Sequence, residues 1–314
     1  MADLSWIQGP PKTILLATDL SARCDRATDR AAELANLWGA RLVVLNVLEF
    51  DDEEFLESRR TAELPSWRQP RDREAAVSAQ LRRDLGEDLR GMEIRIEHGP
   101  PAATIDAVAR DINADLIIVG VARNETLGRY FLGSTVERLA RQTPIPLLVV
   151  KSRVRPYGEI LVATDFSPPS QHALTAAARF FAHAPLTLLH AWEVPFRGLL
   201  DSPNFRQEWT AMEKRGCDKF VAESGLSRDQ QRDLQVLLEH GSAETIIRSY
   251  MLDKGVDLIV VGTHGRSGLF DVRLGGTAKR ILEAAPGDVL LIREPRSVRA
   301  PGARPRSKKS AAVG

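Results

Sequence analysis

The stretch ILLATD at residues 14–19 recurs as ILVATD at residues 160–165, a shift of 146 residues. Farther along the chain, ADLIIVG at 114–120 is matched by VDLIVVG at 256–262, a shift of 142 residues. Matching segments that keep their order and nearly keep their offset indicate that a whole unit was duplicated. Because solenoid repeats are only roughly 20 to 50 residues long, the repeated unit has the size of a domain.

Each copy has the pattern of an α/β domain. In the first copy, short runs rich in Val, Ile and Leu alternate with helical patterns that have one apolar face. The predicted strands are 14–18, 42–48, 94–96, 116–119 and 147–150, and the predicted helices are 27–38, 74–89, 102–111 and 134–142. The second copy repeats this order, with Ser167 as a helix N-cap. Strands alternating with helices predict two tandem, doubly wound, five-stranded parallel sheets of Rossmann-like type.

The chain is expected to divide into two domains, a linker and a tail, with boundaries at 1–151, 152–158 (the linker), 159–295 and 296–314 (the tail). The tail carries six bases and no acid among Pro, Gly, Ala and Ser residues, which predicts disorder. It has no aromatic residue to stack on bases, so a solubilising role is favoured over nucleic-acid contact. The charged stretches 51–73 and 195–215 are less periodic and are expected to be insertions or lids.

The composition is that of a globular protein, with 43% hydrophobic residues, 27% charged residues and a net charge of +1. No apolar run approaches the roughly 18 residues of a membrane span. Residues 1–11 lack the pattern of a secretory signal, so a cytoplasmic protein without membrane contact is expected. Cys24 and Cys217 form no disulfide framework and no zinc-binding pattern, so neither a metal site nor a cysteine function is predicted.

Polar residues at the carboxyl ends of the strands are candidates for the site, because ligands of open parallel sheets bind there. The first predicted strand of each copy ends in a Thr-Asp pair, Thr18-Asp19 and Thr164-Asp165. These carboxylates suit a ribose hydroxyl or a bound cation. They also suit a turn or a helix N-cap, although their recurrence in both copies favours the functional interpretation.

A glycine-rich segment follows the fourth predicted strand of the second copy, GTHGRSGLFDVRLGGTAKRIL at 262–282. Closely spaced glycines let backbone N–H groups approach an anion, and the next helix start adds free donors and its positive dipole end. The pattern predicts a phosphate cradle; the alternative is a flexible solvent loop. The G-x-G-x-x-G fingerprint is absent, and the P-loop-like spacing of Gly128 and Gly133 lacks its lysine. Metalloprotease, calcium-loop and serine-hydrolase motifs are also absent.

From residue 12 to residue 294 the chain resembles two consecutive domains of the universal stress protein family, whose nucleotide signature is G-x2-G-x9-G-[ST]. The resemblance implies ATP, with or without Mg²⁺, as the ligand. It also implies that Asp165 and the adjoining residues Ala163 and Thr164 hold adenosine, while the main chain near Ala191 meets adenine. The expected phosphate contacts in the second copy are Gly262, His264, Gly265, Arg266, Gly275, Gly276 and Thr277.

The second copy departs from the family signature at one position. Gly276 stands at the Ser/Thr position and loses a hydroxyl, for which Thr277 could compensate. A hydrogen bond to a charged group is typically worth about 1.5 to 3 kcal/mol, so this loss lowers the expected phosphate affinity. His264 and Arg266 suggest catalysis, but a loop histidine without an evident partner is more often structural. No catalytic residue is therefore predicted.

The first copy departs from the signature differently. Gly120, Gly133 and Ser134 match, but Arg123 stands where the second glycine belongs. Arg123 either strains the backbone and covers the phosphate position, or binds the phosphates through its guanidinium. We therefore expect the second copy to be the more intact ATP site, and the other residues that correspond to it in the first copy are Asp19, Val47 and Thr135.

The leading functional hypothesis is an ATP-binding regulatory protein of the stress response, which acts through nucleotide-dependent conformation and binding of protein partners still to be identified. One alternative is a slow ATPase or a nucleotidyl-transferring enzyme on the same fold. Another is a dimerisation module without ligand. The resemblance also implies pairing of the final strands, 147–150 with 289–292, so that the two copies form a pseudo-dimer within one chain; a homodimer of whole chains is a further option.

Overall fold

The computed structural model describes residues 9–21, 24–49, 73–84, 92–124, 129–193, 203–263 and 274–293. The long strands of its first half are β1 (Thr13–Ala17), β2 (Arg41–Leu48), β3 (Glu93–His98), β4 (Leu116–Gly120) and β7 (Leu147–Val150). Its helices are α1 (Asp25–Trp38), α3 (Arg73–Asp84), α4 (Pro101–Asp111) and α5 (Ser134–Gln142). Two short strands, β5 (Ala122–Asn124) and β6 (Arg129–Phe131), form a separate antiparallel hairpin between β4 and α5.

The second half repeats this order of elements. Its strands are β8 (Ile160–Ala163), β9 (Leu186–Trp192), β10 (Gln235–His240), β11 (Leu258–Gly262) and β12 (Asp288–Ile292). Its helices are α6 (Pro168–Phe180), α7 (Pro203–Ala222), α8 (Arg228–Asp233), α9 (Ala243–Lys254) and α10 (Gly276–Ala284).

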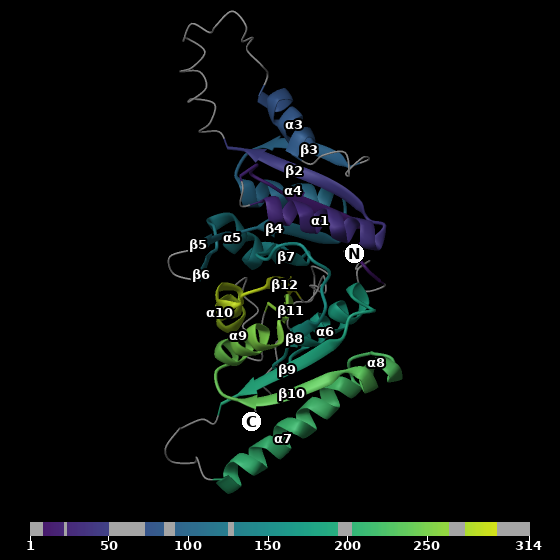
Figure 1. The fold of residues 1–314 in the computed structure, drawn as a ribbon, viewed down its shortest axis with the longest axis vertical. Coiled ribbons are helices and arrows are strands. Elements are labelled where there is room, and N and C mark those ends of the chain that lie inside the picture. The colour runs from purple at the N-terminus through teal and green to yellow at the C-terminus, as the bar shows by residue number, and fades with distance from the viewer. Residues whose placement is uncertain are drawn as a thin grey trace, which may run out of the picture.

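One ten-stranded sheet runs through the whole molecule, in the order β10-β9-β8-β11-β12-β7-β4-β1-β2-β3 (Figure 1). Within this sheet the strands of each half are parallel to one another, and both halves have the same strand order. The halves meet where β7 and β12 pair antiparallel, with Leu148 opposite Leu290. The predicted doubly wound sheets and their pairing through the final strands are confirmed.

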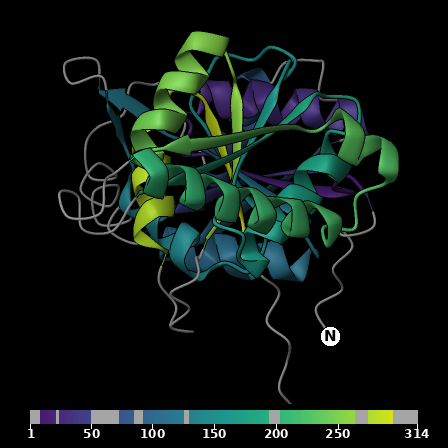
Figure 2. The ribbon, with the colours of Figure 1, turned by 90° about the horizontal axis from the view of Figure 1, so that it is seen from below.

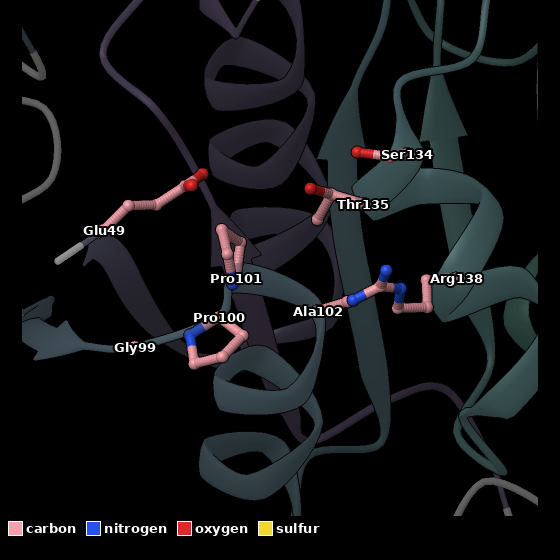
Figure 3. A pocket seen from close by; sticks show the side chains of 8 residues that line it. All are labelled: Glu49, Gly99, Pro100, Pro101, Ala102, Ser134, Thr135 and Arg138. Carbon is pink, nitrogen blue, oxygen red and sulfur yellow. The ribbon is translucent and has the colours of Figure 1, made fainter. Parts of the chain in front are cut away.

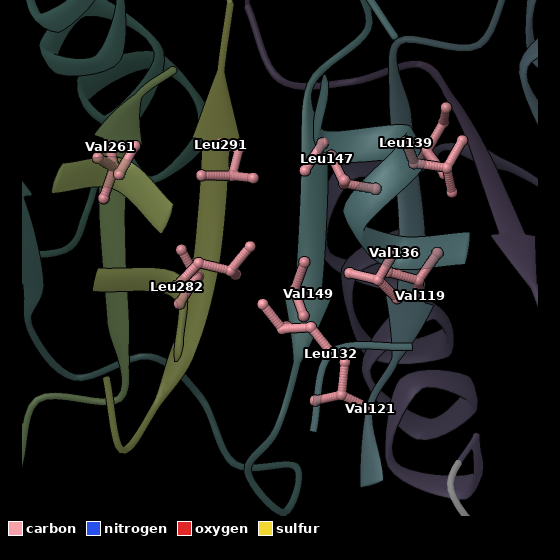
Figure 4. Close-up of a cluster of buried hydrophobic side chains, with 14 of the residues drawn as sticks. Val119, Val121, Leu132, Val136, Leu139, Leu147, Val149, Val261, Leu282 and Leu291 are labelled. Atoms are coloured by element: carbon pink, nitrogen blue, oxygen red, sulfur yellow. The ribbon is translucent and has the colours of Figure 1, made fainter. Parts of the chain in front are cut away.

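Helices cover both faces of this sheet (Figure 2). The helices α1, α3, α6 and α7 contribute to the core on one face, and α4, α5, α9 and α10 to the core on the other. Successive strand residues point to opposite faces, so Leu16 of β1 lies in the first core and Leu15 in the second. Both cores contain residues of both halves, and Figure 4 shows Val149 and Leu291 of the adjoining final strands in the second core.

Two cations cross between the halves just after the final strands. Lys151 follows β7, is only 1% exposed, and donates from Nζ to two carbonyl oxygens at the C-terminal end of α10, at 2.5 and 2.9 Å. Arg293 follows β12 and donates from Nη2 to two carbonyl oxygens at the end of α5, at 3.1 and 2.5 Å. Carbonyl groups at a helix C-terminus attract cations, so each half caps a helix of the other.

The segment predicted as a linker is packed against both halves. Asp288 of β12 is fully buried and accepts hydrogen bonds from the backbone N–H groups of Lys151 and Ser152, both at 2.8 Å, and from the Tyr157 hydroxyl at 2.6 Å. The buried Arg30 of α1 places its Nε 3.3 Å from Oδ2 of Asp288 and its Cζ 3.9 Å from the centroid of the Tyr157 ring. Ser152 and Tyr157 of the linker therefore belong to a buried polar cluster.

Local signals at the ends of two helices behave partly as expected. Gly39 closes α1 in a left-handed conformation, with φ of 61°, which glycine adopts without strain. Ser167 occupies the N-cap position of α6, but its hydroxyl donates to Oδ1 of Asp165 at 2.5 Å and does not bond a helix N–H. The residue therefore supports the turn before α6.

In the stretch 195–215, expected to be an insertion or lid, the described part is helical, since α7 begins at Pro203. The apolar pattern of α7 is interrupted because Glu213 occupies one of its buried positions. The β5–β6 hairpin was also not predicted. Residues 51–72, 85–91 and the tail at 296–314 lie outside the described residues, so the predictions made for them remain predictions.

Candidate functional site

A cavity of about 350 Å³ lies at the carboxyl ends of the strands in the first half. This volume is within the range of small-ligand sites. Its lining comes from the end of β2, the turn before α4, and the first turns of α4 and α5: Glu49, Gly99, Pro100, Pro101, Ala102, Ser134, Thr135 and Arg138. The candidate site of the first copy is therefore built at the edge of the sheet where ligands of such folds bind.

The two sides of the cavity differ in chemistry. Ser134, Thr135 and Arg138 of α5 lie on one side, while Glu49, Pro100 and Pro101 lie on the other (Figure 3). The start of α5 adds the positive end of a helix dipole to the first side. Within the described part of the chain, neither Arg138 nor Glu49 has a hydrogen-bond or ion-pair partner. One side thus offers hydroxyls and a cation to an anion, and the other offers a carboxylate to a hydroxyl.

The corresponding positions of the second copy are arranged differently. Arg280 of α10 corresponds to Arg138, and its Nε lies 2.5 Å from Oε2 of Glu244 on α9. Its Nη2 also donates to the Thr277 hydroxyl at 3.4 Å. Glu244 corresponds to Ala102, which has no carboxylate. The guanidinium of the second copy is therefore already paired with an acid.

The turns after β1 and β8 have the same hydrogen bonds. The threonine Oγ1 accepts from the N–H two positions later, at 3.1 Å in the first copy and 2.9 Å in the second. Asp19 and Asp165 each accept, through Oδ1, from the N–H and the hydroxyl of the serine two positions later. The intervening Leu20 and Phe166 have φ of 59° and 62°, which is uncommon for large side chains. Both aspartates therefore hold a turn, and their contact with ribose stays a prediction.

A polar side chain of the second strand supports each of these turns. Asn46 of β2 donates from Nδ2 to the Thr18 carbonyl at 2.9 Å, and His190 of β9 donates from Nδ1 to the Thr164 carbonyl at 2.8 Å. Nε2 of His190 also lies 3.3 Å from Oε2 of Glu213, and both side chains are about nine-tenths buried. In the second copy, an imidazole therefore ties α7 to the turn that carries Asp165.

The glycine-rich loop of the second copy is described only at its two ends. His264, Gly265 and Arg266 lie outside the described residues. Gly262 is the last residue of β11, and a Cβ there would lie 2.8 Å from a backbone carbon at the start of α6. Gly275 is the N-cap of α10, and its N–H donates to the carbonyl of Thr263, before the loop, at 2.8 Å. The close approach of α6 to the end of β11 therefore by itself requires a glycine at position 262.

Two residues at the start of α10 remain available for the predicted phosphate role. Gly276 and Thr277 form its first turn, as Ser134 and Thr135 form that of α5. A Cβ at Gly276 would meet no atom closer than 3.9 Å, so packing does not require a glycine at that position. The missing hydroxyl is therefore a chemical difference between the copies and has no steric cause.

The corresponding segment of the first copy forms the β5–β6 hairpin. Arg123 lies in β5, opposite Tyr130 of β6, in an extended antiparallel pair. The backbone strain considered for Arg123 is therefore absent, because an extended conformation suits any residue. Gly120 ends β4 opposite Val150, and Gly133 is the N-cap of α5 with an ordinary negative φ.

The structure brings together some of the expected residues of the first copy and leaves others apart. Ser134 and Thr135 line the cavity, and four other expected residues are not in its lining, namely Asp19, Val47, Gly120 and Gly133. The side chain of Arg123 lies outside the described part of the structure. In the second copy, Ala163 ends β8, while Ala191 lies in β9 at the position that Val47 has in β2. The sequence interpretation missed Glu49, the 99–102 turn and Arg138. For Arg138 a signal was available, because it is a basic residue one helical turn after the Gly133-Ser134 pair.

The sequence also predicted no reactive cysteine, no metal site and no membrane-spanning segment. Burial raises the pKa of the Cys24 and Cys217 thiols to about 11, which disfavours the reactive thiolate. Among the described residues, no group of three or more His, Cys, Asp or Glu side chains is placed to hold a metal ion. None of the helices in the described ranges is both long and apolar enough to cross a membrane.

The fold and the site define a class: a tandem pair of doubly wound α/β domains with candidate ligand sites at the carboxyl ends of their strands. The sequence model of the Universal stress protein family matches residues 11–151 and 156–293, and the chain belongs to this family. A universal stress protein of Mycolicibacterium smegmatis is 25% identical over 292 residues, covering 89% of this chain and 96% of that protein. One from Staphylococcus saprophyticus is 30% identical over 167 residues, covering 49% of this chain and 92% of that protein.

Solved structures share the tandem fold. A universal stress protein from Pseudomonas aeruginosa has a TM-score of 0.62 at 22% identity, with 92% of this chain and 95% of that chain covered. A universal stress protein from Archaeoglobus fulgidus has a TM-score of 0.62 at 17% identity, with 90% and 98% covered. Because nearly the full length of each chain is matched, the similarity of fold extends over both halves.

Proposed function

We propose that this chain is an ATP-binding regulatory protein of the stress response, in which the bound nucleotide biases conformation and partner binding. One observation carries the proposal: a cavity at the carboxyl ends of the strands, with the hydroxyls of Ser134 and Thr135 and the guanidinium of Arg138 on one side. Hydroxyls at a helix start and a guanidinium fork are the groups that bind phosphate. Glu49 on the opposite side is suited to accept from ribose hydroxyls.

The donor set of the cavity fits a phosphate better than a metal held by protein alone. Its carboxylate is Glu49, and the described residues contain no cluster that could form a metal cage. Mg²⁺ would therefore arrive with ATP, since it is usually bound by one or two carboxylates and phosphate oxygens. The chain's own residues would bind and orient the nucleotide, and no catalytic residue is assigned.

A physical route from the nucleotide to the rest of the molecule supports the regulatory part of the proposal. The β5–β6 hairpin lies between β4 and α5, next in sequence to the proposed phosphate-binding turn, and β6 contacts α10 of the second half. A ligand that rearranges this segment would therefore act on the helix that begins at Gly276. The interface between the halves is the element whose conformation ATP is proposed to bias.

The test uses the full chain and titration calorimetry with ATP in the presence and absence of Mg²⁺. The double variant Ser134→Ala/Thr135→Val should weaken binding at one site about a hundredfold or more, because it removes two hydroxyl donors to a charged group. The matched variant Thr277→Val tests the second copy, which the glycine-rich loop led us to expect as the better site. Binding should also raise the melting temperature, since a ligand at 100 times its Kd adds about 2.7 kcal/mol of stability.

Two results would overturn the proposal. If denatured protein releases no adenine nucleotide and ATP leaves the melting temperature unchanged, the ligand-free dimerisation module becomes the better interpretation. If the chain hydrolyses ATP well above the buffer rate and His264→Ala or Arg266→Ala abolishes turnover, the enzyme alternative replaces the regulatory one.

A further inference from the structure

The two copies differ in charge where the starts of two helices face each other, that is, between α4 and α5 in the first copy and between α9 and α10 in the second. Arg138 and Arg280 occupy the same position in α5 and α10, one helical turn after the proposed phosphate-binding residues. The residue that faces this arginine from the preceding helix is Ala102 in the first copy and Glu244 in the second. The second copy therefore has one additional negative charge beside its arginine.

The side-chain environments of the two arginines follow from this difference. Arg280 is engaged by the Glu244 carboxylate at 2.5 Å, with side chains that are 58% and 36% exposed. Arg138 has no ion-pair partner among the described residues, and its guanidinium lines the 350 Å³ cavity. Ala102 is 5% exposed and borders the same cavity. Within the described part of the chain, an anion entering the first copy therefore meets a cation without an acidic partner, whereas one entering the second meets a cation that already shares its charge with a carboxylate.

We propose that the Ala102/Glu244 difference sets how strongly each copy discriminates among nucleotides by their phosphate charge. The first copy, in which Ala102 leaves Arg138 without a carboxylate at this position, favours the more highly charged triphosphate over the monophosphate. Glu244 repels added phosphate charge and occupies Arg280, so the second copy favours the triphosphate less. The proposal rests on the nucleotide binding proposed above, and it concerns the ratio of two affinities and not the absolute affinity of either copy.

Electrostatics explains why a ratio is the appropriate measurement. Contacts to adenine and ribose are common to ATP and AMP and cancel in the ratio of their affinities. Repulsion by a carboxylate grows with the charge of the ligand and is weakened by salt. A bidentate arginine contact is likewise made to phosphate oxygens and not to the base. The residue at position 102 or 244 should therefore change the ATP-to-AMP ratio, and raising the salt concentration should reduce that change.

The experiment exchanges the two residues in the full chain. Titration calorimetry with ATP and with AMP, at about 50 mM and 500 mM salt, gives the ratio for each site in Ala102→Glu and Glu244→Ala. Glu244→Ala should raise the ATP-to-AMP affinity ratio of the second copy about five- to tenfold. Ala102→Glu should lower the same ratio in the first copy by a similar factor. The uncharged variants Ala102→Gln and Glu244→Gln separate charge from volume: the first should leave the ratio unchanged, and the second should act as Glu244→Ala does.

Melting temperatures show whether each variant folds. The second copy already accommodates a glutamate at the position equivalent to Ala102, and an acid in the first turn favours a helix. If Ala102→Glu does not fold, the two substitutions of Glu244 carry the test.

The outcomes separate this inference from the proposed function. If ATP and AMP bind but Glu244→Gln and Glu244→Ala leave both ratios unchanged at low salt, the inference is wrong and the nucleotide function stands. If neither nucleotide binds any variant or the original chain, the proposed function fails and the inference fails with it.

Discussion

Replacing Lys151 by methionine should remove a dependence of stability on pH that this one buried amine causes. Lys151 is 1% exposed, and its Nζ donates to two carbonyl oxygens at the end of α10. Burial lowers the pKa of the Lys151 ammonium from its ordinary 10.5 to about 7, although the negative charges of Asp288 and Glu283 act in the opposite direction. Methionine has a similar length and carries no charge to bury.

The sign of the effect follows from proton binding in the two states. Between pH 7 and 10.5 the unfolded chain keeps the proton on Lys151 while the folded chain releases it. The unfolded state then binds more protons, so the free energy of unfolding rises with pH through this window. At about 1.4 kcal/mol for each unit of pKa, the whole window corresponds to roughly 5 kcal/mol, of which about 2 kcal/mol falls between pH 7 and 9.

Urea unfolding followed by circular dichroism at pH 7, 8 and 9 measures this effect. Over this pH range, the free energy of unfolding of the original chain should rise by about 2 kcal/mol more than that of Lys151→Met. Lys151→Arg should also lose this gain, because a guanidinium does not release its proton. Arginine is expected to fit there, since Arg293 holds the equivalent position in the other half. Lys279→Met, which removes a half-buried lysine of α10, is the control that should keep the gain.

The reasoning is refuted if the original chain and both Lys151 variants show the same change with pH. A rise that disappears equally in Lys279→Met would also refute it, because a general change in surface charge would then be the cause.

Three further substitutions have expected effects on the free energy of unfolding, measured by urea denaturation. Gly262→Ala should cost about 1 to 3 kcal/mol because its Cβ would lie 2.8 Å from the backbone of α6, whereas Gly276→Ala, with 3.9 Å of clearance, should cost less than about 1 kcal/mol; equal costs would contradict the packing argument. Trp38→Phe should cost about 1 kcal/mol because its Nε1 donates to a carbonyl of α6 in the other half at 3.0 Å, and no loss would show that this bond is not stabilising. Glu213→Gln should cost roughly 2 kcal/mol because it weakens a buried contact with His190, and an unchanged stability would argue against that contact.

Much of the fold could be predicted from local patterns. The helix Ser134–Gln142 and the strand Leu147–Val150 have the predicted bounds, because their apolar residues recur with the period of one secondary structure. Gly39 ends α1 through its own backbone conformation, which is also a local property. The duplication was visible as matching segments of sequence, and the two copies fold into the same order of strands and helices.

The candidate site was only partly predictable. Ser134 and Thr135, which line the cavity, were predicted because Gly133-Ser134 matches the end of the family signature and the segment recurs at 275–277. Arg138 was missed because many helices carry a surface arginine, and only the cavity distinguishes this one. The helix α7 was missed because its buried Glu213 looks like an exposed residue until His190 of another element is placed beside it.

The sequence by itself determined the duplicated α/β unit, the order of its elements and the glycine-rich segments that follow the fourth strands. Only the tertiary structure decided that Lys151 is a buried cap of α10, that Arg138 has no ion-pair partner among the described residues and that Arg280 is held by Glu244. The physical reason is range: helix and strand patterns depend on neighbours within a few residues. The charge state and availability of an ionisable side chain depend instead on partners that the fold brings from about 36 or more than 130 residues away.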